Sequence, residues 1–408
     1  MKLNLKTAKS SAVQFARRQK RLLRFRVINP GLFCIESALV RLYSGAASVR
    51  PVRVVLVSDG KESTSEEQFN PFSAYRAELR RELNLISAHL LLKDVLRAPG
   101  LLLRRFDVIL LKLSFRTARD EVSRAVQKIR SAAAERPIIY YDGDDDLCVQ
   151  WPELVPSVDL YVKKHLFRDK SHYLVPYKGK SNLTDYVSKQ YGFSFADNIH
   201  ATETHPLAPD QLDKLILGGN VALDSNIMEL YSKLHEGRGD SSREVDVMFR
   251  GNVPKDWLYY LRKDIEPSLA RLQESYNVIT PQKRVTREEY YSEMMNSKIC
   301  LSPFGFGEIC WRDFEAIICG CMLVKPDMGH VDTLPNLFRP FETYVPVRWD
   351  YSDVYEQCSY YLKHADERER IAATAFDELK TFYENRQFLS VFSEILKRAQ
   401  LVRSPLRS

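Results

Sequence analysis

The sequence predicts an α/β protein built from two doubly wound, Rossmann-like domains that face each other across a cleft. A chain of 408 residues exceeds what one hydrophobic core usually organises, which favours two domains. Short strand-like apolar runs alternate with segments of helical periodicity in both halves, as in parallel βαβ units. The glycine- and serine-containing segment 237–243 reads as a linker between the halves. We therefore expect a basic arm, two domains and a C-terminal tail, over residues 1–50, 51–236, 244–390 and 391–408.

The N-terminal half alternates strands and helices as far as residue 165. The next segment, residues 166–220, has weak periodicity and many aromatic, Pro, Asn and His residues, which predicts a long lid-like connection. The expected strands are 51–60, 106–113, 137–141 and 158–163, and the expected helices are 74–89, 117–134 and 223–235.

The C-terminal half repeats the alternation. Its expected strands are 245–249, 276–280, 299–302 and 344–347, with one more short strand ahead of Lys325. Its expected helices are 257–274, 286–296, 351–365 and 367–388, together with one helix inside the motif described below.

The composition is that of a soluble globular protein, with 45% hydrophobic and 28% charged residues. No apolar run approaches the roughly 20 residues that cross a bilayer, and the N-terminus lacks the apolar core of a secretory signal. The seven cysteines are an odd number, and those between Cys300 and Cys321 lack the paired spacing of a zinc site. We therefore expect buried thiols in a reducing, cytoplasmic protein.

Positive charge is concentrated at the N-terminus. Over residues 1–53 twelve Lys or Arg accompany one acidic residue, Glu36, whereas the whole chain carries only +7. Within residues 10–28 basic and apolar side chains interleave, which is typical of a short helix on an anionic membrane surface. A solvated basic extension is the alternative. Because the rest of the chain is net acidic, we expect no nucleic-acid partner.

The most informative segment lies between Ser297 and Pro326. It reads as a short apolar strand, a glycine-containing loop, an apolar helix and a second strand. Gly305 and Gly307 would let backbone approach a phosphate closely, and the helix N-terminus offers free N–H groups and a positive dipole end. Glu315 on that helix can accept hydrogen bonds from ribose hydroxyls. The segment therefore predicts a site for a phosphorylated ligand.

The same segment contains two spaced patterns: Cys300-Leu-x-Pro303-x-Gly305, and Arg312-x-x-Glu315-Ala-Ile-x-x-Gly320-Cys321. They resemble the donor-site signature of exostosin-like glycosyltransferases and, more broadly, of bacterial family-1 glycosyltransferases. The chain departs from the usual glutamate pair of the latter, because Gly307 stands eight residues before Glu315 and Glu308 is one residue off. The resemblance covers residues 245–365 and implies the GT-B architecture, which takes a nucleotide-sugar donor.

The resemblance also implies residue roles. Glu315 would bind the donor ribose and Arg312 the diphosphate. The alternatives are a surface carboxylate paired with a basic residue for Glu315, and a structural ion pair with Asp313 or Glu308 for Arg312. The loop that would close around the phosphates consists of Gly305, Phe306, Gly307 and Glu308.

Arg250, Gly251 and Asn252 follow the first strand of the second domain. An arginine and a glycine turn at that place can present a cation and N–H groups to a leaving diphosphate, so we expect neither a metal nor a cofactor. An ordinary strand-to-helix turn is the alternative. Lys325 and His330 follow a later strand and are weaker donor-binding candidates, since a lone histidine is more often structural.

The acidic run from Asp142 to Asp146 allows three interpretations. It resembles the metal-binding Asp-x-Asp of the other large glycosyltransferase fold, although that fold has one mixed domain. Alternatively Asp142, Asp144 or Asp145 is the general base that deprotonates an acceptor hydroxyl, with like-charge crowding raising its pKa. Third, the run caps a helix or binds nothing.

The combined prediction is a glycosyltransferase that moves a sugar from a nucleotide-sugar donor to a glycan or glycolipid, in polysaccharide or lipopolysaccharide synthesis. It would work in the cytoplasm, with residues 10–28 as a contact to the inner membrane. A non-catalytic nucleotide- or glycan-binding protein on the same frame is the alternative. Glu315→Ala is expected to abolish transfer.

Overall fold

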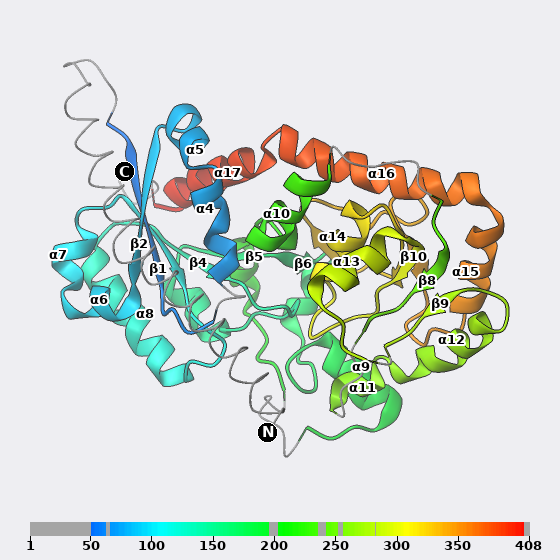
Figure 1. The fold of residues 1–408 in the computed structure, drawn as a ribbon. Helices are drawn as coiled ribbons and strands as arrows, with labels where there is room; N and C mark the ends of the chain where they lie inside the picture. Colours follow the sequence, from blue (N-terminus) through cyan, green and yellow to red (C-terminus); the bar gives the residue numbers. More distant parts are fainter. Residues whose placement is uncertain are drawn as a thin grey trace, which may run out of the picture. The chain divides into compact units, whose positions relative to one another are not determined.

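The structure is a computed structural model that describes residues 50–62, 66–195, 203–235, 242–251, 256–281 and 283–403. The basic segment 10–28 and Asn252 lie outside these residues. The chain divides into two compact units. The first comprises residues up to Tyr141, Glu153–Tyr161 and Ser393 onward, and the second comprises Asp142–Pro152 and Val162–Phe392. Figure 1 shows the elements in chain order.

The first unit contains a sheet in which β2, β1, β3, β4 and β5 lie side by side in that order. The pairings of β1 with β2 and β3, and of β3 with β4, are parallel. All five residues of β3 are buried, as expected for a parallel strand covered on both faces. The strands are β1 (Val52–Ser58), β2 (Leu85–Leu91), β3 (Val108–Lys112), β4 (Ile138–Asp142) and β5 (Leu160–Lys163), and the helices are α4 (Asn70–Ala74), α5 (Arg76–Glu82), α6 (Leu92–Arg97), α7 (Pro99–Leu103) and α8 (Arg119–Ala133).

The helix expected over residues 74–89 is wrong in its second half. Helix α5 ends at Glu82, and β2 begins at Leu85. Between them Asn84 adopts a left-handed conformation with φ of 47°, which ends the helix. The apolar run that follows is continuous because β2 is buried on both faces, so its periodicity does not separate strand from helix.

The second unit contains a five-stranded sheet in the order β13-β11-β10-β8-β9, and every neighbouring pair is parallel. In both units the second strand of the series lies at one edge and the first strand lies next to it, which is the doubly wound arrangement. The predicted α/β class with two doubly wound parallel sheets is therefore confirmed, and the facing cleft stays a prediction. The strands are β8 (Val245–Met248), β9 (Val278–Ile279), β10 (Ser297–Leu301), β11 (Met322–Pro326) and β13 (Val345–Val347), with β7 (Leu215–Leu217) earlier in the chain.

Helices of the second unit follow the predicted order with one interruption. The helix expected over 257–274 is broken into α11 and α12, because Pro267 cannot donate the backbone hydrogen bond of a helix interior. The helices are α9 (Asn182–Tyr191), α10 (Ser225–Leu234), α11 (Trp257–Tyr260), α12 (Glu266–Gln273), α13 (Arg287–Met295), α14 (Trp311–Ile318), α15 (Val354–Lys363) and α16 (Ala365–Glu384), followed by α17 (Gln387–Arg403). Among the described residues, none of the helices combines the length and the apolar character that a membrane span requires.

The core of the second unit covers both faces of its sheet. Ile299 and Val324 belong to one cluster with residues of α12 and α15, such as Leu269 and Val354. The alternate strand residues, such as Cys300, point to the opposite face and are also fully buried. Each such apolar side chain contributes about 1.5–3 kcal/mol of burial free energy, which fixes the strand ends that carry the loops.

The segment expected as a lid-like connection forms part of the second unit. Strand β6 (His165–Phe167) pairs antiparallel with β12 (Val331–Thr333), and the Arg168 N–H donates to the carbonyl of His330 at 2.9 Å. Helix α9 begins with a capping box between Ser181 and Thr184. This pairing brings residues near 165 and 182 to the loops that follow β10 and β11.

Candidate functional site

The predicted loops meet at the carboxyl ends of two neighbouring strands. Arg250 and Gly251 follow β8. The glycine loop (residues 305–308) follows β10, which pairs with β8. The strand order reverses between β8 and β10. On one side β9 lies next to β8, and on the other side β11 and β13 continue the sheet from β10. In open α/β sheets ligands bind beyond the carboxyl ends at this point.

Two neighbouring arginines, Arg262 and Arg312, lie near the glycine loop. Nε and Nη1 of Arg312 are buried and have no hydrogen-bond partner. Arg262 donates from Nε to the carbonyl of Phe304 at 2.8 Å, and its Nη2 lies 3.7 Å from where a β-carbon of Gly305 would stand. Burial and the neighbouring Arg312 lower the pKa of Arg262 to about 10. The unsatisfied, buried N–H groups of Arg312, with a second guanidinium nearby, make a site for an anion.

Glu315 is held by two tyrosines of α13. Its Oε2 accepts from the Tyr290 hydroxyl and its Oε1 from the Tyr291 hydroxyl, each at 2.9 Å. The residue is 8% exposed. A capping box between Thr286 and Glu289 starts α13, which fixes both tyrosines. Because each carboxylate oxygen can accept a second hydrogen bond, Glu315 keeps acceptor capacity for hydroxyls of a ligand.

The glycine loop packs directly on the acidic run, about 160 residues earlier in the chain. A β-carbon at Gly307 would stand 1.7 Å from the carbonyl oxygen of Asp145. Only glycine permits this approach without moving the backbone. Two segments that were singled out independently in the sequence are thus brought together by the fold.

The carboxylates of the acidic run differ in their surroundings. Asp142 is fully buried, pairs with Lys163 at 3.0 Å and accepts from the backbone N–H groups of Asp144 and Gln150, so it orders the loop. Asp145 is half exposed, and although desolvation acts to raise its pKa, the Lys164 ammonium at 2.9 Å brings the net shift below the ordinary value. The Oδ2 of Asp144 is buried without a hydrogen-bond partner.

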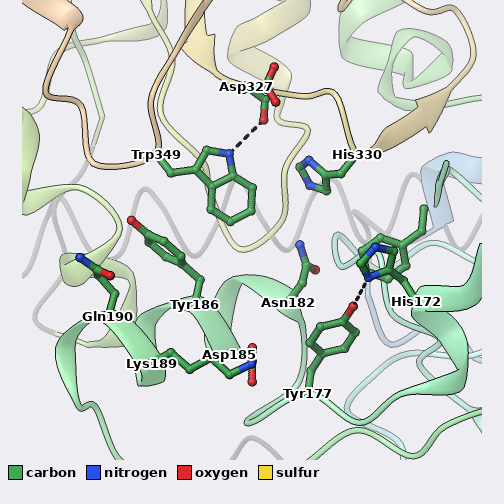
Figure 2. Close-up of a pocket in the computed structure, with 11 residues that line it drawn as sticks. His172, Tyr177, Asn182, Asp185, Tyr186, Lys189, Gln190, Asp327, His330 and Trp349 are labelled. Atoms are coloured by element: carbon green, nitrogen blue, oxygen red, sulfur yellow. Dashed lines mark hydrogen bonds and ion pairs between the residues drawn. The ribbon is translucent and has the colours of Figure 1, made fainter. Parts of the chain in front are cut away.

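His330 lies beyond the end of β11 and lines a cavity of about 440 Å³. Figure 2 shows its imidazole beside Trp349, above Asn182 of α9. The ring centroids of His330 and Trp349 are 5.2 Å apart. The structure therefore places His330 at a pocket whose other walls come from α9 and from residues 167–177.

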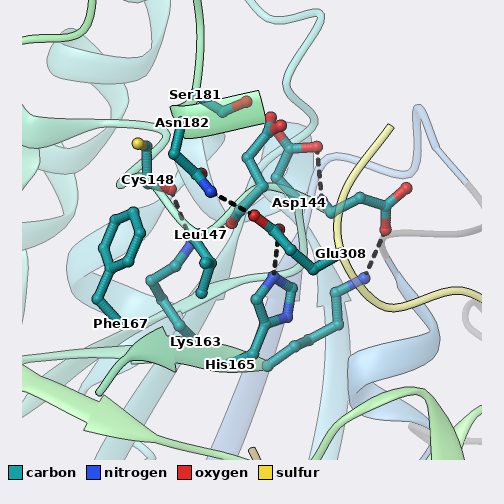
Figure 3. A network of polar contacts seen from close by, with 12 residues as sticks. Asp144, Leu147, Cys148, Lys163, His165, Phe167, Ser181, Asn182 and Glu308 are labelled. Carbon is teal, nitrogen blue, oxygen red and sulfur yellow. Dashed lines mark hydrogen bonds and ion pairs between the residues drawn. The ribbon is translucent and has the colours of Figure 1, made fainter. Parts of the chain in front are cut away.

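Glu308 is the centre of a buried polar network (Figure 3). Asn182 donates from Nδ2 to its Oε1 at 2.7 Å. Nε2 of His330 lies 3.6 Å from Oε1, and Nε2 of His165 lies 3.9 Å from Oε2. Desolvation acts to raise the pKa of Glu308, but the His330, His165 and Asn182 contacts bring it below its ordinary value. An ionised carboxylate thus sits fully buried in the loop, with Oε2 lacking a hydrogen-bond partner.

His165 is expected to make the stability of the protein depend on pH. Burial lowers the pKa of its imidazole to about 4, whereas an unfolded histidine titrates near 6.5. Between these values the unfolded state binds more protons, so this group destabilises the fold by up to about 3 kcal/mol as pH falls from 6.5 to 4. Chemical denaturation at several pH values should show this loss in the wild type and a shallower dependence in His165→Gln. His205→Gln, at an exposed position, is the control; an unchanged slope in His165→Gln contradicts the assignment.

Of the predicted donor-binding residues, Arg250 and Lys325 form ion pairs with carboxylates of the protein, and Phe306 is exposed. Arg250 makes a two-pronged ion pair with Glu293, with distances of 2.8 and 2.6 Å. Lys325 has no exposed surface and pairs with Asp313 of α14 at 3.1 Å, so its charge is balanced within the fold. Phe306 is 48% exposed, with its ring 6.1 Å from that of Trp257.

Sequence reasoning did not single out Arg262, Asn182 or Tyr290. Arg262 stands inside a segment that reads as one helix, and only the break between α11 and α12 turns it toward the glycine loop. Asn182 lies in the weakly periodic segment, far along the chain from Glu308. The available signal for Tyr290 was the tyrosine pair that precedes the motif strand, because Tyr290 and Tyr291 lie inside a clearly capped helix, α13.

Residues 243–390 match a family model described as glycosyl transferase-like. The match includes the glycine loop, Arg312 and Glu315. This match identifies the protein as an enzyme of the glycosyltransferase class. The match confirms the resemblance to family-1-like glycosyltransferases, and the finer likeness to the exostosin-like group stays a prediction.

Solved structures with a similar arrangement have low sequence identity. An alpha-glucosyltransferase (AGT) in complex with UDP is 11% identical, with a TM-score of 0.44 over 83% of this chain and 99% of that one. A glycosyltransferase from Rickettsia africae ESF-5 is 8% identical, with a TM-score of 0.45 over 86% of this chain and 99% of that one. TarM is 8% identical, with a TM-score of 0.42 over 71% of this chain and 54% of that one. Similarity at this level carries no argument about function, and no curated protein sequence matches the chain significantly.

Proposed function

We propose that the protein transfers a sugar from a nucleotide-sugar donor, and that the second unit binds the donor at the loops after β8 and β10. One observation carries the proposal: Arg312 has buried N–H groups without partners and lies near Arg262, whose Nη2 lies beside Gly305. A diphosphate supplies the negative charge and the acceptor oxygens that Arg312 lacks. As the diphosphate leaves, the same fixed cations stabilise the charge that develops.

The ribose of the donor is assigned to Glu315. Its two tyrosine hydrogen bonds fix the carboxylate one helical turn from Arg312, so one helix presents both groups. This spacing suits a nucleoside diphosphate, whose ribose and phosphates are adjacent. The Gly305 N–H donates to the Gly307 carbonyl at 3.0 Å, which holds the loop beside these two groups in a tight turn.

For the general base we favour Asp144 among the three acidic candidates. Its Oδ2 has no hydrogen-bond partner. In contrast, Asp142 forms a buried ion pair with Lys163, and Asp145 forms an ion pair with Lys164. The loop that carries Asp144 touches Gly307, so an acceptor hydroxyl beside it would lie near the donor sugar. The acceptor is a glycan or glycolipid of the cell surface, and the basic segment 10–28 holds the enzyme against the membrane.

The alternative function is nucleotide or glycan binding without catalysis. It predicts binding with no turnover, so one experiment separates the two. The purified protein is incubated with UDP-, GDP- and dTDP-hexoses, with and without crude cell-surface glycolipid, and release of nucleoside diphosphate is measured. We expect release from one donor class, accelerated by the glycolipid extract. Binding of a donor without any release supports the alternative, and neither binding nor release contradicts both.

A further inference from the structure

A second ligand pocket lies in the same unit, beside the glycine loop. Its volume is about 440 Å³, within the roughly 300–1,000 Å³ of small-molecule sites. One wall follows the carboxyl ends of β11 and β13, with Asp327, His330 and Trp349. Helix α9 and the segment around Tyr177 form the opposite wall, as Figure 2 shows.

The aromatic surface of the pocket is held rigidly. The indole Nε1 of Trp349 donates to the carbonyl of Asp327 at 3.1 Å. The rings of Tyr186, Phe304 and His330 meet the indole at angles of 75°, 83° and 61°, with centroids 5.1–5.2 Å away. A side chain braced on several edges loses little entropy when a ligand packs on its face.

Polar side chains surround the aromatic surface of the pocket. Oδ1 of Asn182 is buried without a hydrogen-bond partner, and Nε2 of His330 makes no hydrogen bond but lies 3.6 Å from Glu308; both residues line the pocket. The cation of the lining, Lys189, is neutralised by Asp185 at 2.6 Å. A phosphate therefore finds no uncommitted positive charge here, which separates this pocket from the arginine pair.

We propose that this pocket is a saccharide subsite that holds one pyranose ring of the acceptor. A pyranose presents C–H groups on its faces and hydroxyls around its rim, which matches a rigid aromatic surface ringed by an amide, an imidazole and carboxylates. The assignment to the acceptor rests on the proposed function, because that function places the donor at Arg312.

Asn182 and His330 connect the pocket to Glu308 of the glycine loop. Asn182 lines the pocket, has a buried Oδ1 without a hydrogen-bond partner, and donates from Nδ2 to Glu308 in the glycine loop. A sugar hydroxyl that binds Oδ1 would fix this side chain and thereby the carboxylate of Glu308. The sugar beside the donor loop would then be the ring that receives the transferred unit.

Saturation-transfer NMR with methyl glycosides tests the subsite directly. The probes are the methyl pyranosides of glucose, galactose, mannose and rhamnose, added to the full chain. We expect saturable binding of at least one, strongest for its ring C–H protons, and at least a tenfold weaker affinity in Trp349→Ala and Tyr186→Ala. Tyr360→Ala is the matched control, since Tyr360 is 44% exposed on α15 and does not line the pocket.

The outcomes separate this proposal from the donor site. If no glycoside binds, or if binding survives both pocket variants, the subsite is overturned. If a nucleotide-sugar displaces the glycoside but the free nucleoside diphosphate does not, the ring belongs to the donor and the acceptor assignment fails. If UDP or GDP binding itself requires Trp349, the pocket holds a nucleotide and the proposal is again overturned. If no nucleotide binds anywhere while the glycoside still requires Trp349, the donor proposal fails and the saccharide site stands.

Discussion

Glu315→Ala is expected to abolish sugar transfer and to weaken nucleotide binding by about 10- to 100-fold. Each hydrogen bond to a charged group is worth about 1.5–3 kcal/mol, and the ribose would lose the carboxylate that accepts from its hydroxyls. The alanine variant also leaves the Tyr290 hydroxyl, buried in α13, without its acceptor. That orphaned group costs about 1–3 kcal/mol of stability, so the alanine result needs a companion.

Glu315→Gln is the cleaner companion variant. Glutamine keeps the volume and one carbonyl oxygen, so the fold should melt within a few degrees of the wild type. Nucleotide affinity by calorimetry and donor turnover should both fall, because the amide donates where the ribose needs an acceptor. Glu288→Ala, an exposed carboxylate in the first turn of α13, is the control and should change neither. Wild-type turnover in Glu315→Gln would remove the ribose role.

Asp313→Ala is expected to lower the free energy of unfolding by about 3–5 kcal/mol. Asp313 and Lys325 are both fully buried, and the aspartate also accepts from the Ser302 hydroxyl at 2.6 Å and the Cys310 N–H at 2.9 Å. The variant leaves a buried ammonium without its counterion and frees the loop from β10. Urea denaturation measures the loss.

A double variant identifies the cause of that loss. Asp313→Leu with Lys325→Met removes both charges at similar volume and should recover part of the stability, since apolar replacement of a buried pair is often neutral. Glu356→Ala breaks the exposed pair with Arg271 and should cost no more than about 1 kcal/mol. If Asp313→Ala costs no more than Glu356→Ala, the buried pair does not support the motif.

The sequence predicted the repeating strands because parallel strands buried on both faces read as short apolar runs. It failed at residues 85–91, where the same continuous run also fits a helix, and a single left-handed residue, Asn84, decided the outcome. Glu315 was predicted from its place on the helix after the glycine loop, and Arg312 from the resemblance to a donor-site signature that spans the same helix. Local pattern is sufficient when a site lies on one element.

Contacts between distant segments were beyond the sequence. Nothing in the spacing of residues 142–146 indicates that this run touches Gly307, or that Asn182 reaches Glu308. The same applies to Lys325. A lysine after a strand of the motif is a candidate for binding phosphate, but this one forms a buried ion pair with Asp313. Charge pairing within the fold decides which cations remain for a ligand, and that decision depends on tertiary packing.

The most direct test of the donor site is thermal unfolding with free UDP, GDP and dTDP, in the wild type and in Arg312→Ala. A ligand that binds only the folded state stabilises it by about 2.7 kcal/mol at 100 times its dissociation constant. We predict that at least one nucleoside diphosphate raises the melting temperature of the wild type, and that Arg312→Ala, folded without ligand, shows little of this rise. An equal rise in Arg312→Ala, or no rise with any of the three, would contradict the proposal that the arginine pair at Gly305 binds the donor diphosphate.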